Sequence, residues 1–533
     1  MTAPKPFGPW LDRFFQSYYR HRPVNATFIG VHDHDHRLPD FSPSGAGDAL
    51  ADMRSLLEES RGLDPASLTD PERIDLRLAT GFLEIQRWEF ESRHFHRGNP
   101  SLYTGEAIFG VMSLFLTDFA PLPERAAAAR ARLDAFGAFF EQARANVPEA
   151  PPGWTNRAIR ECRGGLALLT NGARHLAGMP GTDWKPFLAA AERAARVLEG
   201  YRHHLETTTL LRPVSTVAAG PEALEFYIKH GHCLAESADA IAEYAEAELA
   251  RAKRYLAERE ADAVAITGTA GTDPRYQAVW DDARDTALRH QLLTWPDFPI
   301  RYVPRPAWAA EAARDLYFLY YRSPAAFGRP PVHEYLVPPE DPGESAVKLN
   351  HVVHHGGIGH HVQNWHAFRA RSRIGRVAAV DCASRIAMFC GGTMAEGWAC
   401  YATDLMGETG FLTNAERYDE QRTRARMCAR AVVDVRLHQG RFSLADAAAY
   451  YEREAGMPAD AAMGEAVKNS MFPGGALMYV MGTDKVHQLR QTLSARLGGR
   501  FSLKAFHDEF LSHGSIPVTL IAETMMEQAD GAE

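Results

Sequence analysis

Apolar residues recur at helical spacing along most of the chain. In the segment 235–260, alanines and other apolar residues return every three or four positions, and charged residues occupy the remaining face. The same pattern fills the segments 121–147, 184–208, 413–438, 443–455 and 476–497. Clusters of proline and glycine separate these segments, as is typical of turns between helices. The pattern therefore predicts a mainly α-helical protein.

A few short segments depart from this periodicity. Residues 299–304 and 316–321 are aromatic, β-branched or flanked by proline, which predicts a small sheet. Residues 331–342 are predicted to be a loop, because their prolines interrupt either regular structure. We divide the chain near residue 220 into an N-terminal helical half (1–220) and a C-terminal half (221–533) with the candidate chemistry. The two halves are expected to pack as one body.

Composition excludes several classes of protein. The 533 residues are 46% hydrophobic and 23% charged, which indicates a soluble globular chain. With 58 basic and 67 acidic residues the net charge is −9, so neither nucleic acid nor a membrane is an expected partner. No apolar run predicts a membrane span, and the N-terminus lacks the pattern of a secretory signal. The six cysteines are scattered without a CxxC pair, which predicts mostly buried thiols in a cytoplasmic protein.

Histidines are concentrated in one segment. Residues 351–366, HVVHHGGIGHHVQNWH, contain six of the 23 histidines: His351, His354, His355, His360, His361 and His366. Histidines beside glycines could simply line a polar turn or cap a helix. Imidazole is however the commonest metal ligand, and six imidazoles in sixteen residues favour a metal site.

The spacing of these histidines requires an irregular backbone. His354 and His360 are six residues apart, which on an ideal helix turns them about 240° from each other. They converge only if Gly356 to Gly359 break or bulge the helix. His354 and His361 share a helical face but would lie about 10 Å apart along the axis. Either His360 or His361 could therefore be the second ligand beside His354.

A third ligand is needed for a catalytic zinc site with one open position. Glu396, at the start of the helical segment that contains Glu-Gly-Trp-Ala, is the candidate, although it could equally be a solvated helix start. We predict His354, His360 and Glu396 as metal ligands and zinc as the metal.

Four motifs together resemble a bacterial family, domain of unknown function 885. They are HHGGIGHHVQ at 354–363, EGWACY at 396–401, PGGALMYVMG at 473–482 and FHDEFLSHGSIP at 506–517. The resemblance is clear over about residues 220–525. It implies a large helical, cleft-shaped fold similar to zinc carboxypeptidases, and metal-dependent hydrolysis of peptide or amide bonds with a glutamate as general base.

The sequence departs from the family pattern at several motif positions. His355 stands where the family has its glutamate, and Asn469-Ser470 replace an expected Arg-Tyr pair. The other departures are Ile358 for proline, Thr403 for a second glutamate and Gly475 for glutamine. The first change removes the expected carboxylate base, and the loss of the arginine removes a carboxylate anchor.

The sequence thus leaves several functions open. The first is a metal-dependent hydrolase acting on a small-molecule or short-peptide substrate, in which His355 is the acid–base group or joins the metal. Four nitrogen and oxygen ligands could instead favour iron, copper or manganese and a lyase or oxidative reaction. A catalytically inactive relative that binds a metal or a peptide is the second hypothesis, and an interaction protein without metal is the third. The oligomeric state stays open.

Further polar residues are candidates for the reaction. His361 is a candidate catalytic residue besides competing for the metal. Tyr479 could donate a hydrogen bond to a developing oxyanion, or be a half-buried helix residue. His507 next to Asp508 resembles a catalytic pair, although adjacent helical residues do not face each other. The helix predicted over 422–436 is rich in arginine, which usually marks a solvated face but could supply an arginine to an anionic substrate.

Overall fold

The computed structural model describes residues 6–263, 273–316, 321–328, 332–337, 342–383 and 386–531. Over these residues the chain is predominantly helical with two short strands, which confirms the predicted fold class. Each segment predicted to be helical contains helix, and the segment 121–147 is divided in two at Ala135.

The elements of the first half are α1 (Phe7–His21), α2 (Pro23–Ile29), α3 (Pro43–Ser60), η1 (Pro65–Ser67), α4 (Asp70–Glu91), α5 (Pro100–Met112), α6 (Leu122–Asp134), α7 (Phe136–Asn146), α8 (Pro152–Ala167), η2 (Leu168–Gly172), α9 (Ala173–Ala177), α10 (Lys185–His204) and η3 (Leu205–Thr209). They are followed by α11 (Pro221–His230), α12 (Ala238–Glu258), η4 (Glu260–Asp262), α13 (Asp273–Arg289), β1 (Ile300–Pro304), α14 (Ala307–Ala310), η5 (Ala312–Arg314), β2 (His333–Val337), α15 (Glu344–Ala346), η6 (Val347–Gly356), α16 (His360–Ala367) and α17 (Arg373–Val377). The last elements are α18 (Gly392–Glu408), α19 (Asn414–His438), α20 (Leu444–Ala455), α21 (Ala459–Met471), α22 (Met478–Leu497), η7 (Gly498–Arg500), α23 (Leu503–Ser512) and α24 (Val518–Gly531).

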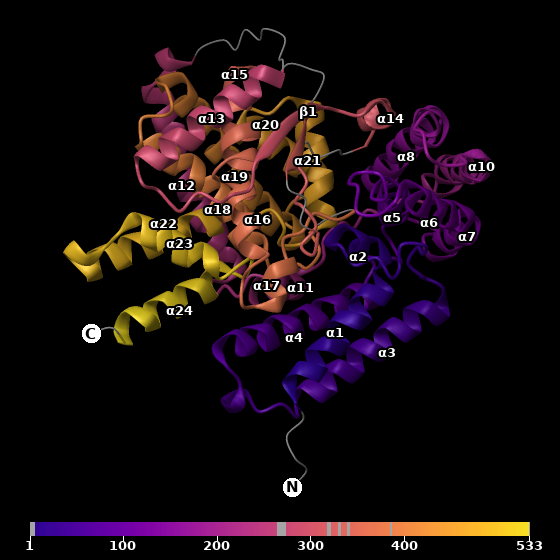
Figure 1. The fold of residues 1–533 in the computed structure, drawn as a ribbon, viewed down its shortest axis with the longest axis horizontal. Coiled ribbons are helices and arrows are strands. Elements are labelled where there is room, and N and C mark those ends of the chain that lie inside the picture. The colour runs from indigo at the N-terminus through magenta and orange to yellow at the C-terminus, as the bar shows by residue number, and fades with distance from the viewer. Residues whose placement is uncertain are drawn as a thin grey trace.

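The helices are arranged in neighbouring groups. In Figure 1 the indigo helices α1, α3 and α4 lie together, and the purple helices α5 to α10 form a neighbouring group. The later helices make the largest group, in which α12 packs along α19 and α18 packs along α22. The largest hydrophobic cluster contains residues from Phe7 to Met525, so elements of both halves share one core. The domain boundary near residue 220 stays a prediction.

The small sheet is formed differently from the prediction. β1 lies in the predicted segment 299–304, but it pairs in parallel with β2, with Tyr302 opposite Tyr335. The prediction that 331–342 is only a loop is therefore wrong. The prolines of that segment flank the strand rather than interrupt it, and the intervening HEYLV is free to extend. The other predicted strand, 316–321, falls mostly on 317–320, outside the described residues.

Helix α18 is buried on nearly all sides. Its residues from Gly392 to Met406 are buried except Glu396, Cys400 and Asp404, which follow each other at intervals of four and so share one face. The helix crosses α22 where Gly397 meets Gly482. A Cβ on Gly397 would lie only 2.6 Å from the Cα of Gly482, so this crossing requires glycine. The close contact fixes the position of α18 against α22, and with it the position of Glu396.

All six cysteines are free thiols, and four of them, Cys162, Cys382, Cys390 and Cys428, are buried. This confirms the predicted buried thiols. In the described part of the chain, no helix combines the length and the apolar character that crossing a membrane requires.

Candidate metal centre

The histidine segment is interrupted at its glycines. Residues Val347–Gly356 form a π-helix, the chain then breaks, and a new helix begins at His360. A Cβ on Gly359 would collide with the carbonyl oxygen of His354, so the break depends on glycine at this position. The irregular backbone that the histidine spacing required is therefore present.

Two tryptophans hold the break in place. The indole nitrogen of Trp280 donates to the carbonyl oxygen of Gly356 at 2.7 Å. The indole nitrogen of Trp398 donates to the carbonyl oxygen of Ile358 at 2.9 Å. Because Trp398 follows Glu396 by two residues, this bond ties the Glu-Gly-Trp motif of α18 directly to the turn between the histidines.

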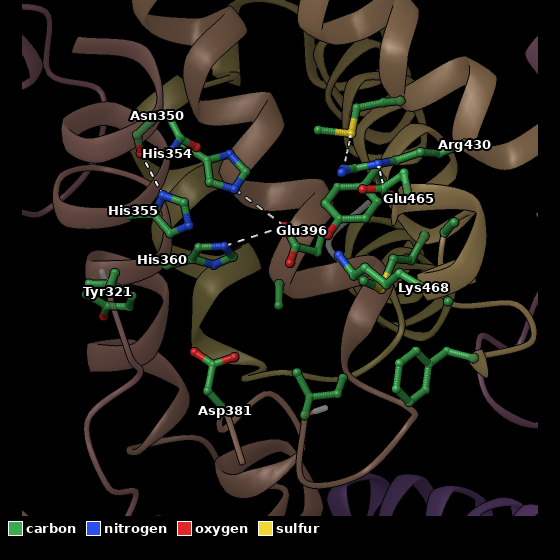
Figure 2. Close-up of a pocket in the computed structure, with 18 of the residues that line it drawn as sticks. Tyr321, Asn350, His354, His355, His360, Asp381, Glu396, Arg430, Glu465 and Lys468 are labelled. Atoms are coloured by element: carbon green, nitrogen blue, oxygen red, sulfur yellow. Dashed lines mark hydrogen bonds and ion pairs between the residues drawn. The ribbon is translucent and has the colours of Figure 1, made fainter. Parts of the chain in front are cut away.

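Three imidazoles and one carboxylate converge at this point (Figure 2). One ring nitrogen each of His354, His355 and His360 can be chosen so that all lie within 4.8 Å of one another. Oε2 of Glu396 lies 3.4 Å from Nε2 of His354 and 3.6 Å from Nε2 of His360. The three predicted ligands are thus neighbours, and His355 is a fourth possible donor.

The donor distances fit a small metal ion. Zinc–nitrogen and zinc–oxygen bonds of about 2.0–2.1 Å place the ligand atoms of a tetrahedral site about 3.3 Å apart. The two distances from Glu396 are close to this value. A set of imidazole and carboxylate donors suits zinc, and also iron, copper or manganese.

The orientation of His355 is set by the backbone. Its Nδ1 lies 2.7 Å from the carbonyl oxygen of Asn350, which as an acceptor requires a proton on Nδ1. The lone pair of the neutral ring is then on Nε2. Hydrogen bonds of this kind commonly fix the tautomer of metal-binding histidines.

Electrostatics at the centre favour the neutral forms of His354 and His355 and the ionised form of Glu396. Burial lowers the pKa of His354 and of His355, the latter to well below its ordinary value. Burial acts in the same direction on His360, but its interactions with Glu396, Asp381 and Gln363 together outweigh burial and raise the pKa. Burial alone would raise the pKa of Glu396, yet the two imidazoles hold it well below its usual range. Neutral imidazole and ionised carboxylate are the forms that bind metals.

His361 points away from this group, although it follows His360 directly. Its Nε2 lies 2.7 Å from the carbonyl oxygen of Phe298, and its ring stacks on the Phe298 ring with centroids 4.7 Å apart. The side chain is fully buried. Of the two competing histidines, the structure therefore brings His360, and not His361, to Glu396.

His507 is also remote from the group. Its Nδ1 donates to the carbonyl oxygen of Leu292 at 2.6 Å, and the hydroxyl of Tyr401 lies 2.8 Å from its Nε2. Asp508 accepts hydrogen bonds from the backbone and hydroxyl of Thr294, so it does not orient His507. His507 therefore packs and forms hydrogen bonds in the core, away from the three histidines and Glu396.

The histidine group lines a large cavity of about 850 Å³. Tyr479 also lines it, as do the other two polar residues of the α18 face, Cys400 and Asp404. Figure 2 shows the histidines on one wall, with Arg430, Glu465 and Lys468 on the opposite wall. The cavity is large enough for a short peptide or a comparable small molecule.

Several cavity residues were missed from the sequence. Asp381 lies below His360 in Figure 2, where burial raises its pKa, and its carboxylate accepts from the backbone of Ser323 at 3.2 Å. It precedes Cys382 in an irregular segment, and no motif distinguishes it. Glu465 and Lys468 were likewise not singled out, although Lys468 directly precedes the unusual pair Asn469-Ser470.

Comparison with known proteins identifies the family. The family of bacterial proteins of unknown function DUF885 matches residues 23–525, so the chain belongs to it. This confirms the resemblance inferred from the motifs and extends it through the N-terminal helices. Among curated proteins, none matches the sequence significantly.

Two solved structures share the fold over its whole length. A putative lipoprotein of unknown function from Shewanella oneidensis matches with a TM-score of 0.72 at 19% identity, over 98% of this chain and 100% of that one. A putative lipoprotein from Colwellia psychrerythraea matches with a TM-score of 0.76 at 17% identity, over 99% and 100%. An M32 carboxypeptidase from Deinococcus radiodurans R1 aligns over 98% of both chains with a TM-score of 0.37 and 11% identity, too weak a likeness to support an argument.

These comparisons correct the predicted location. The cytoplasmic prediction is contradicted, because both structures with the same fold are described as lipoproteins. The prediction failed because it used unpaired cysteines as a sign of a reducing compartment. Free thiols also occur in proteins of oxidising compartments, so unpaired cysteines do not identify the compartment.

Proposed function

We propose that the protein is a metal-dependent hydrolase that cleaves a peptide or amide bond in a short peptide or small amino-acid-derived substrate. The observation that carries this proposal is the convergence of His354, His360 and Glu396 on the wall of a large cavity, with Oε2 of Glu396 at 3.4 and 3.6 Å from the two imidazoles. Zinc is the proposed metal, because three nitrogen and oxygen ligands with an open fourth position are typical of catalytic zinc sites.

The donor set fits such an ion. His354, His360 and Glu396 would hold it, and the ion would supply polarisation of a carbonyl group and activation of water. The hydrogen bond from His355 to the carbonyl of Asn350 leaves the other ring nitrogen as a proton acceptor beside the ligands. His355 thereby takes the general-base position that a glutamate has in the family pattern. Tyr479 supplies a phenol donor to the same cavity.

Two polar residues predicted from the sequence have no part in this proposal. His361 and His507 are engaged with backbone carbonyls outside the cavity. Their contribution is to hold α16 and α23 in place. The proposal therefore assigns the histidine chemistry to His354, His355 and His360 alone.

One observation favours a second candidate function. If Nε2 of His355 binds the metal as a fourth ligand, no open position remains in a tetrahedral site, and the protein would bind a metal or a peptide without hydrolysing it. A metal that accepts more ligands, such as iron or manganese, would instead permit a non-hydrolytic reaction.

The replacement His355→Ala distinguishes these candidates. The test measures hydrolysis of N-acetylated di- and tripeptides by zinc-loaded protein, with His361→Ala as a matched histidine replacement outside the cavity. A hydrolase that uses His355 as its base loses most of its activity in His355→Ala and keeps its metal. Metal release from His355→Ala, with no hydrolysis by the unaltered protein, would contradict the hydrolase proposal and favour the binding protein.

A further inference from the structure

The wall of the cavity that faces the histidine group is built from charged residues. Arg430 of α19 and Lys468 of α21 lie there with Glu465 between them (Figure 2). Arg426, one turn before Arg430, lines the same cavity. Three cationic side chains thus share this part of the wall with one carboxylate, and the side chain of Arg430 is only 15% exposed.

The guanidinium of Arg430 is poorly provided with acceptors. Its Nε forms an ion pair with Oε1 of Glu465 at 2.9 Å, and neither of these two buried atoms has a well-directed hydrogen bond. Its Nη1 donates to the thioether sulfur of Met427 at 3.2 Å, and sulfur of this type is a weak acceptor. A buried guanidinium normally bonds to several oxygens. An oxygen-bearing anion in the cavity would complete its coordination.

The two walls face each other across one site. In Figure 2, Glu396 lies between the histidines on one side and Lys468 on the other, and all of these residues line the same cavity. Arg430 also lies over the ring of Tyr479, with 5.2 Å between the guanidinium carbon and the ring centroid. One small substrate can therefore contact the metal centre at one end and the cationic wall at the other.

We propose that Arg430 and Lys468 form a carboxylate-binding subsite, so that the substrate carries a free carboxylate beside the bond to be cleaved. This rests on the proposed hydrolase function for the cleavage but not for the binding. The arginine expected before Pro473 is replaced by Asn469, and the anchor is supplied instead by the neighbouring Lys468 and by α19. Glu465 disfavours a doubly charged group such as a phosphate monoester, because its own charge would repel it.

The test compares N-acetylated dipeptides that end in a carboxylate with the same dipeptides ending in an amide. Binding is measured by calorimetric titration on both zinc-loaded and chelator-treated protein, and hydrolysis is measured on the loaded protein. We expect the carboxylate forms to bind at least tenfold more tightly than the amides. Arg430→Gln and Lys468→Gln should each remove most of this difference, mainly through KM, while metal content stays unchanged.

Two further variants make the result decisive. Arg436→Gln is the matched control, because Arg436 lies on the same helix, outside the cavity lining, and pairs with surface carboxylates. Arg430→Gln/Glu465→Gln removes both members of the ion pair and so covers the case in which Arg430→Gln alone does not fold. It should fold and still lose the preference.

The outcomes separate the two proposals. Preferential binding of carboxylates without any hydrolysis would support the subsite and overturn the hydrolase function. Equal hydrolysis of carboxylate and amide forms would overturn the subsite and leave the hydrolase standing. Loss of metal from Arg430→Gln, or equal loss of preference in Arg436→Gln, would also overturn the subsite.

Discussion

The adjacent residues His360 and His361 point in different directions and have different partners. His360 faces Glu396 at 3.6 Å, whereas His361 is stacked on Phe298 and bonded to its carbonyl oxygen. Replacing each by alanine should therefore produce opposite defects. The variant His360→Ala should lose metal affinity, and the variant His361→Ala should lose stability.

The two magnitudes follow from these contacts. Loss of a residue that only supports a ligand typically weakens metal binding by about 10–100-fold, so loss of the ligand His360 should cost at least about 100-fold. His361→Ala leaves the Phe298 carbonyl without its donor, at about 1–3 kcal/mol, and removes a ring stack worth about 0.5–1.5 kcal/mol. The free energy of unfolding should fall by about 2–4 kcal/mol. At about 1.1 kcal/mol per degree for a chain of this length, Tm falls by about 2–4 °C.

The assay is a competition for metal with a chelator, together with thermal unfolding of the metal-free proteins. The expected result is weak metal binding with little change in the metal-free Tm for His360→Ala, and nearly normal metal binding with a lowered Tm for His361→Ala. Equal metal affinities of the two variants would refute the ligand assignment.

Three other perturbations follow from particular contacts. Gly482→Ala should destabilise the fold by about 1–3 kcal/mol and weaken metal binding, because its methyl group would collide with the carbonyl of Thr393 and push α22 away from α18. The control is Gly464→Ala, where a Cβ meets open space. Equal Tm values for the two variants would contradict the close crossing of the two helices. Burial lowers the pKa of His232 to about 4, below its unfolded value of about 6.5. Its contribution to the free energy of unfolding, up to about 3 kcal/mol, is therefore present above pH 6.5 and is lost as the pH falls toward 4. Urea unfolding from pH 7.5 to 4.5 should show this loss of stability, and the variant His232→Gln should show less of it. When the free metal concentration is 100 times the Kd, removing the metal should lower the free energy of unfolding by about 2.7 kcal/mol and the Tm by about 2–3 °C. A Tm that does not change when a chelator is added would contradict metal binding by the native state.

Much of the fold was predictable because helical periodicity is local. Segments such as 235–260 alternate apolar and charged faces over several turns, and the structure has a helix at α12 within it. The strand β2 was missed for the same reason, since its partner β1 is about thirty residues away and nothing within HEYLV indicates the pairing. Pairing between distant segments depends on the tertiary fold, which local patterns do not report.

The candidate site was predictable as a set of residues but not as an arrangement. The glycines between the histidines indicated an irregular backbone, and the structure has one. The choice between His360 and His361 could not be made from the sequence, because the direction of each ring depends on where α16 starts after the break. Asp381 and Lys468 reach the cavity only through the packing of distant segments, so no local pattern marks them.

The measurement that tests the central claim most directly is the metal content of the protein, purified without a chelator and analysed by plasma mass spectrometry. The proposal predicts about one ion per chain in the unaltered protein and a large loss of that ion in both His354→Ala and Glu396→Ala. A protein that stays metal-free after incubation with zinc, iron, copper and manganese salts would contradict the claim. Full metal content in both variants would contradict it equally.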